Sequence, residues 1–233
     1  MRFERMLKGM GLSALGTLLL LAGQAQTASA DTVYTWATDA VVPEGHRGNR
    51  ADPTAGAVAS NRSELANALG SPDKAAINGV NFYSIGMGGE VIFTFGTEFT
   101  NDSAIIYEVT NGSRQNYPET AMLSVATKDD PTHFYDVGQI RNDAATGELI
   151  TISLNNVNAP SPFYYLKLTD TSNRSFFWNP ETRTGRDRNA DGFDVNAVGV
   201  VAVNAVPLPA AGWAGLSLLG GLGVAKWRRM RNA

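Results

Sequence analysis

The sequence predicts an all-β fold, an antiparallel sandwich of two sheets with jelly-roll-like connections. Short apolar runs with alternating side-chain directions recur along the chain, as expected of half-buried strands. The 24 glycines and 10 prolines break the chain into short elements. Charged residues make up only 18% of the 233 residues, which favours turn-rich β structure over helices with many ion pairs.

The strongest strand signal is the run at residues 90–95, which glycines flank on both sides. Val91, Phe93 and Phe95 share one face there, so the run predicts a strand with one buried side. Helix-like content is confined to residues 63–69, where Ser63 is a candidate N-cap. Further strands are predicted at 33–37, 104–109, 122–127, 149–154, 164–169 and 195–203.

The N-terminal 30 residues have the pattern of a signal peptide with an apolar helix. Arg2, Arg5 and Lys8 precede an apolar stretch at 10–22. Ala28 and Ala30 then supply the small residues that signal peptidase reads, so cleavage is expected after Ala30. An uncleaved anchor is disfavoured, because the stretch is short for a span of ~20 residues.

The C-terminal segment, 206–233, predicts a transmembrane helix with a basic end. Residues 206–225 are nearly free of polar side chains and long enough to cross a bilayer. Lys226, Arg228, Arg229 and Arg231 follow at once. Positive charge stays on the cytoplasmic side, so the domain at 31–205 is expected outside the inner membrane.

The start of this segment carries a family resemblance. Val206, Pro207, Leu208, Pro209 and Ala210 stand before a span rich in Gly and Leu, and an Arg cluster ends it. This order resembles the VPLPA variant of the PEP-CTERM sorting tail. The resemblance implies that an exosortase-type membrane protease removes the tail, and that the domain then reaches the cell surface or the medium. The alternative is a permanent single-span anchor.

Five short segments of the central domain carry a second resemblance: 68–73, 82–89, Tyr107-Glu108, Pro118-Glu119 and 192–198. They resemble the jelly-roll domains of PEP-CTERM-bearing cell-surface proteins. This resemblance implies a fold and a cellular context rather than an activity. Relatives often have a second acid where this chain has Asn196, which weakens any ligand role carried over to that strand.

One loop suggests a calcium site. Asp187, Asn189 and Asp191 alternate before a glycine, as in the first half of a calcium loop, and Asp194 follows. The twelfth position is a valine instead of a bidentate Glu, so the loop is not an EF-hand. Asp170 is the candidate for an additional ligand. A structural calcium ion competes with the simpler interpretation that Asp170 begins an Asx turn and the loop is solvated.

Other side chains suggest contact with glycans. Phe176, Phe177 and Trp178 are consecutive in a loop, where they either stack on a sugar or fold back over the core. Glu108 and Glu119 are conceivable as the paired carboxylates of a glycosidase, but surface exposure is the default for glutamate.

Several function classes lack their residues. The chain has no cysteine, no GxSxG elbow, no Walker loop and no zinc spacing around its two histidines. A net charge of −3 disfavours nucleic acid as a partner. We therefore expect a non-enzymatic cell-surface or matrix protein whose partners are signal peptidase and an exosortase-type protease. The alternative is a module that binds exopolysaccharide, and a glycan-cleaving enzyme has less support.

Overall fold

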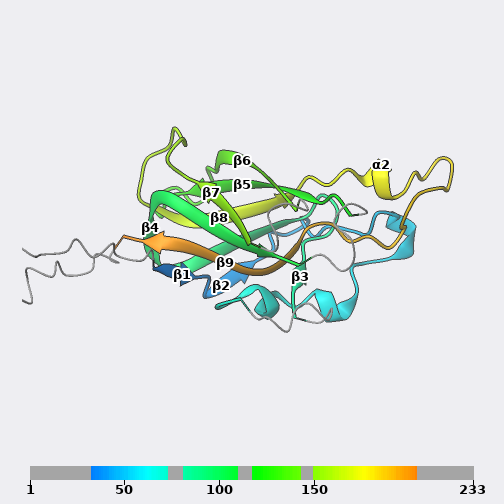
Figure 1. The fold of residues 1–233 in the computed structure, drawn as a ribbon, viewed down its shortest axis with the longest axis horizontal. Helices are drawn as coiled ribbons and strands as arrows, with labels where there is room; N and C mark the ends of the chain where they lie inside the picture. Colours follow the sequence, from blue (N-terminus) through cyan, green and yellow to red (C-terminus); the bar gives the residue numbers. More distant parts are fainter. Residues whose placement is uncertain (1–32, 73–80, 110–116, 143–148, 204–233) are drawn as a thin grey trace, which may run out of the picture. The chain divides into compact units, whose positions relative to one another are not determined.

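The nine described strands form one continuous hydrogen-bonded network, and the longest strand, β4 (Glu90–Glu108), organises it because its two halves pair with different strands and so contribute to the two packed sheets of the sandwich. The strand bends after Phe95, where Gly96 has a φ of +70°, a backbone region that favours glycine. Its pairing with β8 (Phe163–Asp170) shifts in register between Thr94 and Phe99. The computed structural model describes residues 33–72, 81–109, 117–142 and 149–203, and all of these belong to one compact unit (Figure 1).

Each half of β4 is the centre of one sheet. The first half pairs with β2 (Asp39–Val41) and β8, and β8 leads on to β5 (Thr120–Ala126) and β6 (Tyr135–Arg141). The second half pairs with β7 (Leu149–Ser153) and β9 (Asp194–Ala202). Both β1 (Tyr34–Trp36) and β3 (Tyr83–Ser84) pair with β9. All these pairings are antiparallel, so the predicted two-sheet sandwich is confirmed.

The core forms where the inward faces of the two sheets meet. Val91, Phe93 and Phe95 are at most 2% exposed, which confirms the alternation predicted for residues 90–95. Phe99 continues this face and contacts Phe95 edge to face, at 5.2 Å between ring centroids. Burial of this apolar surface is the main favourable term in folding, so the sandwich has a core of its own.

Some predicted elements differ from the observed ones. The strands predicted at 90–95 and 104–109 are two halves of β4. Three strands were not predicted from the sequence: β2 and β3, which have three and two residues, and β6, which shows no clean alternation of burial. The predicted helix at 63–69 is a 3-10 helix, η3 (Leu65–Ala68). Ser63 does not cap it, because its hydroxyl donates to the Ser60 carbonyl, 2.9 Å away, at η2 (Ser60–Arg62).

One end of the sandwich is built from long loops. Figure 1 shows the short helix α2 (Arg174–Phe177) and the loop with η1 (Pro53–Ala55) at the same end, on the right of the view. The last residues of β9 lie at the opposite end. The predicted signal peptide, transmembrane helix and sorting motif lie outside the described residues. Within the described ranges, no helix is long and apolar enough to cross a membrane.

Candidate functional site

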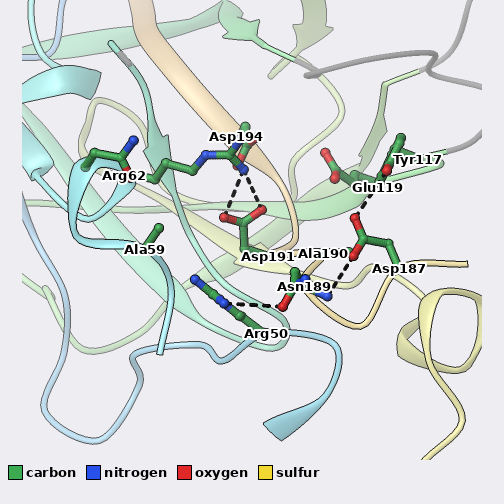
Figure 2. Close-up of a pocket in the computed structure, with 11 residues that line it drawn as sticks. Arg50, Ala59, Arg62, Tyr117, Glu119, Asp187, Asn189, Ala190, Asp191 and Asp194 are labelled. Atoms are coloured by element: carbon green, nitrogen blue, oxygen red, sulfur yellow. Dashed lines mark hydrogen bonds and ion pairs between the residues drawn. The ribbon is translucent and has the colours of Figure 1, made fainter. Parts of the chain in front are cut away.

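A pocket of about 450 Å³ lies at the loop end of the sandwich (Figure 2). Three segments that are far apart in the sequence form it: the loop between β2 and β3, the residues that lead into β5, and the loop between α2 and β9 together with the first residue of β9. Most of its lining residues are polar, which distinguishes it from an apolar ligand cleft. The lining residues are Arg50, Ala59, Asn61, Arg62, Tyr117, Glu119, Asp187, Asn189, Ala190, Asp191 and Asp194.

An ion pair closes one side of the pocket. Figure 2 shows Arg62 with dashed lines to both carboxylate oxygens of Asp191, and the two distances from Nη1 are 3.0 and 3.1 Å. The guanidinium also lies over the ring of Phe82, 5.0 Å from its centroid. Burial disfavours the charge of Arg62, but the carboxylates of Asp191 and Asp194 outweigh burial and raise the pKa of Arg62.

Two carboxyl groups line the pocket from buried positions. Glu119 is 4% exposed and Asp194 is 3% exposed. Burial, followed by the charges of Asp194, Glu108 and Asp191, raises the pKa of Glu119 well above its ordinary value. Burial and the charge of Asp191 also raise the pKa of Asp194, against the hydrogen bond donated by the Ser84 hydroxyl. The lining of the pocket therefore holds protons more tightly than exposed carboxyl groups do.

A buried amide joins Glu119 to a second glutamate. Nδ2 of Asn142 donates to Glu108 Oε1 at 3.3 Å and to Glu119 Oε2 at 3.4 Å. Oδ1 of Asn142 accepts the backbone N–H of Glu119 at 2.7 Å. Glu108 has no exposed surface, so the expectation that both glutamates lie on the surface is wrong. Glu108 is the last residue of β4, and Glu119 directly precedes β5. Both side chains therefore lie where a strand enters the sandwich.

The opposite wall is a turn held by its own side chains. Asp187 accepts a hydrogen bond from the Tyr117 hydroxyl at 3.2 Å and another from the backbone N–H of Asn189 at 2.8 Å. Asn189 in turn accepts from Nη1 of Arg50 at 3.3 Å, which ties this turn to the loop after β2. The wall therefore presents a phenol, a carboxylate, an amide and a guanidinium in a fixed arrangement.

The five residues predicted to bind calcium do not all reach this pocket. Asp187, Asn189, Asp191 and Asp194 line it, but Asp170 does not. Among the described residues, no group of three or more His, Cys, Asp and Glu is placed to hold a metal ion. Calcium binding stays a prediction of the sequence, testable by whether millimolar calcium raises the melting temperature and EDTA lowers it.

Asp170 instead ties three chain segments together. Its carboxylate accepts from the backbone N–H groups of Gly88, Phe193 and Ser172 at 3.0, 2.8 and 3.2 Å, and from the Ser172 hydroxyl at 2.7 Å. The hydrogen bond from the backbone N–H of Ser172 to Oδ1 of Asp170 closes the Asx turn that the sequence predicts. Gly192 passes so close that a Cβ there would lie 2.7 Å from Asp170 Oδ2. Asp170 therefore holds the loop before β9 against the end of β8.

The aromatic triplet supports the wall of the pocket. Phe177 has no exposed surface and packs in a small cluster with Ala51, Met87 and Ala190, so direct stacking of a sugar on its ring is excluded. Its ring stacks with Tyr117 at 6.0 Å, and its carbonyl accepts the N–H of Asp187 at 3.1 Å. The interpretation that the triplet folds back over apolar residues fits Phe177.

Phe176 and Trp178 are half-buried, and arginines lie over their rings. The guanidinium of Arg186 is 4.6 Å from the Phe176 centroid, and that of Arg188 is 5.6 Å from the Trp178 centroid. Arg188 also pairs with Asp52 at 2.8 Å. A role of these two rings in binding glycans stays a prediction, and neither ring lines the pocket.

Four pocket residues were not predicted from the sequence: Arg50, Asn61, Arg62 and Tyr117. Their segments carry no motif, and a polar side chain in a loop is usually solvated. The usable signal was the loop at 187–194, because its side chains Asp187, Asn189, Asp191 and Asp194 all line the pocket. Their partners come from loops more than 60 residues away, and only the closed sandwich brings those loops together.

No family model matches the chain, and no curated protein matches it. Matches among solved structures include the CBM32 of AlyQ in complex with 4,5-unsaturated mannuronic acid, with 14% identity, a TM-score of 0.37, and coverage of 72% of this chain and 97% of that one. They also include CBM32-1 from a family 31 glycoside hydrolase from Clostridium perfringens, with 13% identity, a TM-score of 0.39, and coverage of 72% and 96%.

Another match is the lectin domain of lectinolysin complexed with Lewis B antigen. It has 8% identity and a TM-score of 0.40, and the match covers 70% of this chain and 90% of that chain. At such identities and TM-scores, neither a ligand nor a binding residue transfers from these proteins to this chain.

Proposed function

We propose that the sandwich domain is a non-catalytic glycan-binding module of an exported protein, and that the polar pocket is its glycan site. The observation that carries this proposal is the lining itself. Guanidinium, carboxylate and carboxamide groups from three loops converge on about 450 Å³, a volume in the range of small-molecule sites. Adjacent sugar hydroxyls donate and accept at once, so planar groups with paired donors or acceptors suit them.

Rigidity of the lining supports binding. Arg62, Asp187 and Asn189 each have a partner inside the pocket, so little side-chain entropy is lost when a ligand arrives. A loose polar surface would have to order these groups during binding. Preorganised groups on a β scaffold give specificity for one arrangement of hydroxyls.

A glycan-cleaving activity is the second candidate, because one observation favours it. Glu119 has a raised pKa, Asp191 lies in the same pocket with its carboxyl group 3.0 Å from Arg62, and glycoside hydrolysis uses a pair of carboxyl groups. We prefer binding because both oxygens of Asp191 accept hydrogen bonds from Arg62, and because Glu108, the other glutamate of the predicted pair, does not line the pocket.

The test is binding of the purified protein to a glycan array and to polysaccharides in a pull-down assay. Asn61→Ala, at an exposed pocket residue, is expected to weaken binding at least several-fold. Asn156→Ala changes an equally exposed asparagine outside the pocket and is expected to bind like the native protein. Absence of binding to any glycan would reject the module. Release of reducing ends that stops in Glu119→Gln would establish the enzyme instead.

We also propose the cellular context that the two ends of the sequence indicate. The signal pattern before Asp31 and the motif Val206-Pro207-Leu208-Pro209-Ala210 support export followed by removal of the tail by an exosortase-type protease. A glycan-binding module released in this way would reach exopolysaccharide at the cell surface or in the surrounding matrix.

A further inference from the structure

Acidic groups outnumber basic groups in the pocket. Four carboxyl side chains line it, those of Asp187, Asp191, Asp194 and Glu119, against the two guanidinium groups of Arg50 and Arg62. Three of these carboxyl groups belong to residues that are at most 6% exposed, so bulk water screens their charges poorly. Glu108 adds a further acid behind Glu119 through the shared amide of Asn142.

Arg62 has its acceptors within the pocket, whereas Arg50 is only partly satisfied, because its buried Nε has no hydrogen-bond partner among the described residues. Arg62 donates to both oxygens of Asp191, and Arg50 donates to the side-chain oxygen of Asn189. An anionic sugar would have to compete with Asp191 for Arg62 and would face the remaining carboxyl groups. The arrangement therefore disfavours uronate and sulfated residues.

A positively charged group would relieve the crowding of acids. Glu119, Asp191 and Asp194 are all buried and line the same pocket, and buried like charges repel one another strongly unless a cation lies between them. An ammonium group carries three donors and forms charge-assisted hydrogen bonds with carboxylates. Hydroxyl groups of the same ligand would then hydrogen-bond with the side-chain amides of Asn61 and Asn189 and with the guanidinium of Arg50.

We propose that the pocket takes a sugar residue with a free, protonated amine, so that the module recognises de-N-acetylated amino-sugar glycans. This inference rests on the proposed function, because it assumes that the ligand is a sugar. The inference specifies that the ligand is positively charged. In it, Glu119 and Asp187 recognise the amine. The hydroxyl groups are recognised by Arg50, Asn61 and Asn189.

The experiment titrates the full chain, purified in mild detergent, with single sugars followed by calorimetry or NMR. Glucosamine, galactosamine and mannosamine are compared with their N-acetyl forms and with glucose, galactose and mannose, which avoids any assumption about linkage. At least one amino sugar is expected to bind tenfold more tightly than its N-acetyl and neutral counterparts. Acidifying the solution is expected to weaken this binding, because the carboxylates that face the amine become protonated.

Variants show whether the preference for an amine depends on the carboxyl groups themselves or only on an intact fold. Glu119→Gln and Asp187→Asn keep the shape of the side chain and remove one carboxyl group that can ionise against the amine, so each is expected to reduce the tenfold preference. Glu181→Gln makes the same replacement at an exposed residue outside the pocket lining and is expected to keep the preference. Far-UV circular dichroism and the melting temperature show whether each variant is folded.

The outcomes distinguish this inference from the proposed function. Equal affinity for amino, N-acetyl and neutral sugars, sensitive to Asn61→Ala, would overturn the amine preference and leave the glycan site in place. Tighter binding of glucuronate than of glucosamine would also overturn it. Absence of binding by every sugar, in a chain shown to be folded, would reject the glycan site and the amine preference together.

Discussion

The carboxyl groups of the pocket show how burial changes the chemistry of ordinary residues. Glu119 and Asp194 lie among other acids, and their pKa values are raised by burial first and by neighbouring charges second. The folded protein therefore binds protons that the unfolded chain releases near the ordinary values of 4.5 and 3.8. This difference couples stability to pH.

The contribution of these two groups to stability is expected to be fully present at low pH, where they are protonated in the folded and the unfolded state, and to be lost as the pH rises through the raised pKa values of Glu119 and Asp194. Glu119→Gln keeps an acceptor for Asn142 and removes one titrating group. Its free energy of unfolding is expected to fall less between pH 5 and pH 8 than that of the native protein. Urea unfolding at four pH values measures the slope. A native-like slope in the variant would show that Glu119 ionises normally.

Asp170 is expected to matter for stability more than for ligand binding. Asp170→Asn replaces an acceptor of four hydrogen bonds by an amide that cannot accept all of them. We expect it to lower the free energy of unfolding by about 2 to 4 kcal/mol, because buried backbone donors lose their acceptor.

Asp136→Asn is the control for Asp170, because it changes an exposed aspartate that accepts one hydrogen bond, from the Ser124 hydroxyl at 2.8 Å. Its expected cost is within about 1 kcal/mol. Equal costs for the two variants in urea titrations would contradict the role of Asp170 in holding three segments together.

At the scale of elements, the pocket depends on loops that carry their own small core. α2 places Phe177 against Ala51, Met87 and Ala190, apart from the main core of the sandwich. The carbonyl of Phe177 then holds the turn that begins at Asp187. The loop between α2 and β9 is therefore positioned by apolar packing, although its pocket side is polar.

Phe177→Ala is expected to lower the free energy of unfolding by about 3 kcal/mol and to weaken glycan binding, because the turn at Asp187 loses its support. Phe176→Ala is the matched comparison, since the neighbouring ring is half-buried, and it is expected to cost about 1 kcal/mol. Thermal melts and the glycan pull-down measure both effects. Full glycan affinity in a folded Phe177→Ala variant would show that the small core does not position the pocket.

The prediction for the whole molecule concerns its processing. We expect the intact mass of the protein from cells and medium to correspond to a chain that begins at Asp31 and lacks the residues after the region of Val206 to Ala210. Retention of the segment from Trp213 to Ala233 would indicate a permanent anchor. Replacing Pro207 and Pro209 by alanine is expected to keep the tail attached, since the resemblance assigns the recognition motif to this region.

The fold class and most strands are predictable from the sequence, because alternation of apolar residues is a local pattern that a sheet must satisfy. Val91, Phe93 and Phe95 illustrate this, since each is buried as predicted. The sequence also identified the oxygen-rich loop that begins at Asp187. It failed for β2 and β3, which are too short to show a period.

The residues that face this loop are set by long-range contacts. Asp191 meets Arg62 across 129 positions of the chain, and Asp187 meets Tyr117 across 70. The burial of Glu108 and Glu119 likewise depends on where β4 ends and β5 begins in space. Such contacts depend on how the two sheets close, and no local pattern encodes that closure. The pocket, its excess of acids and its separation from Asp170 therefore followed from the folded chain alone.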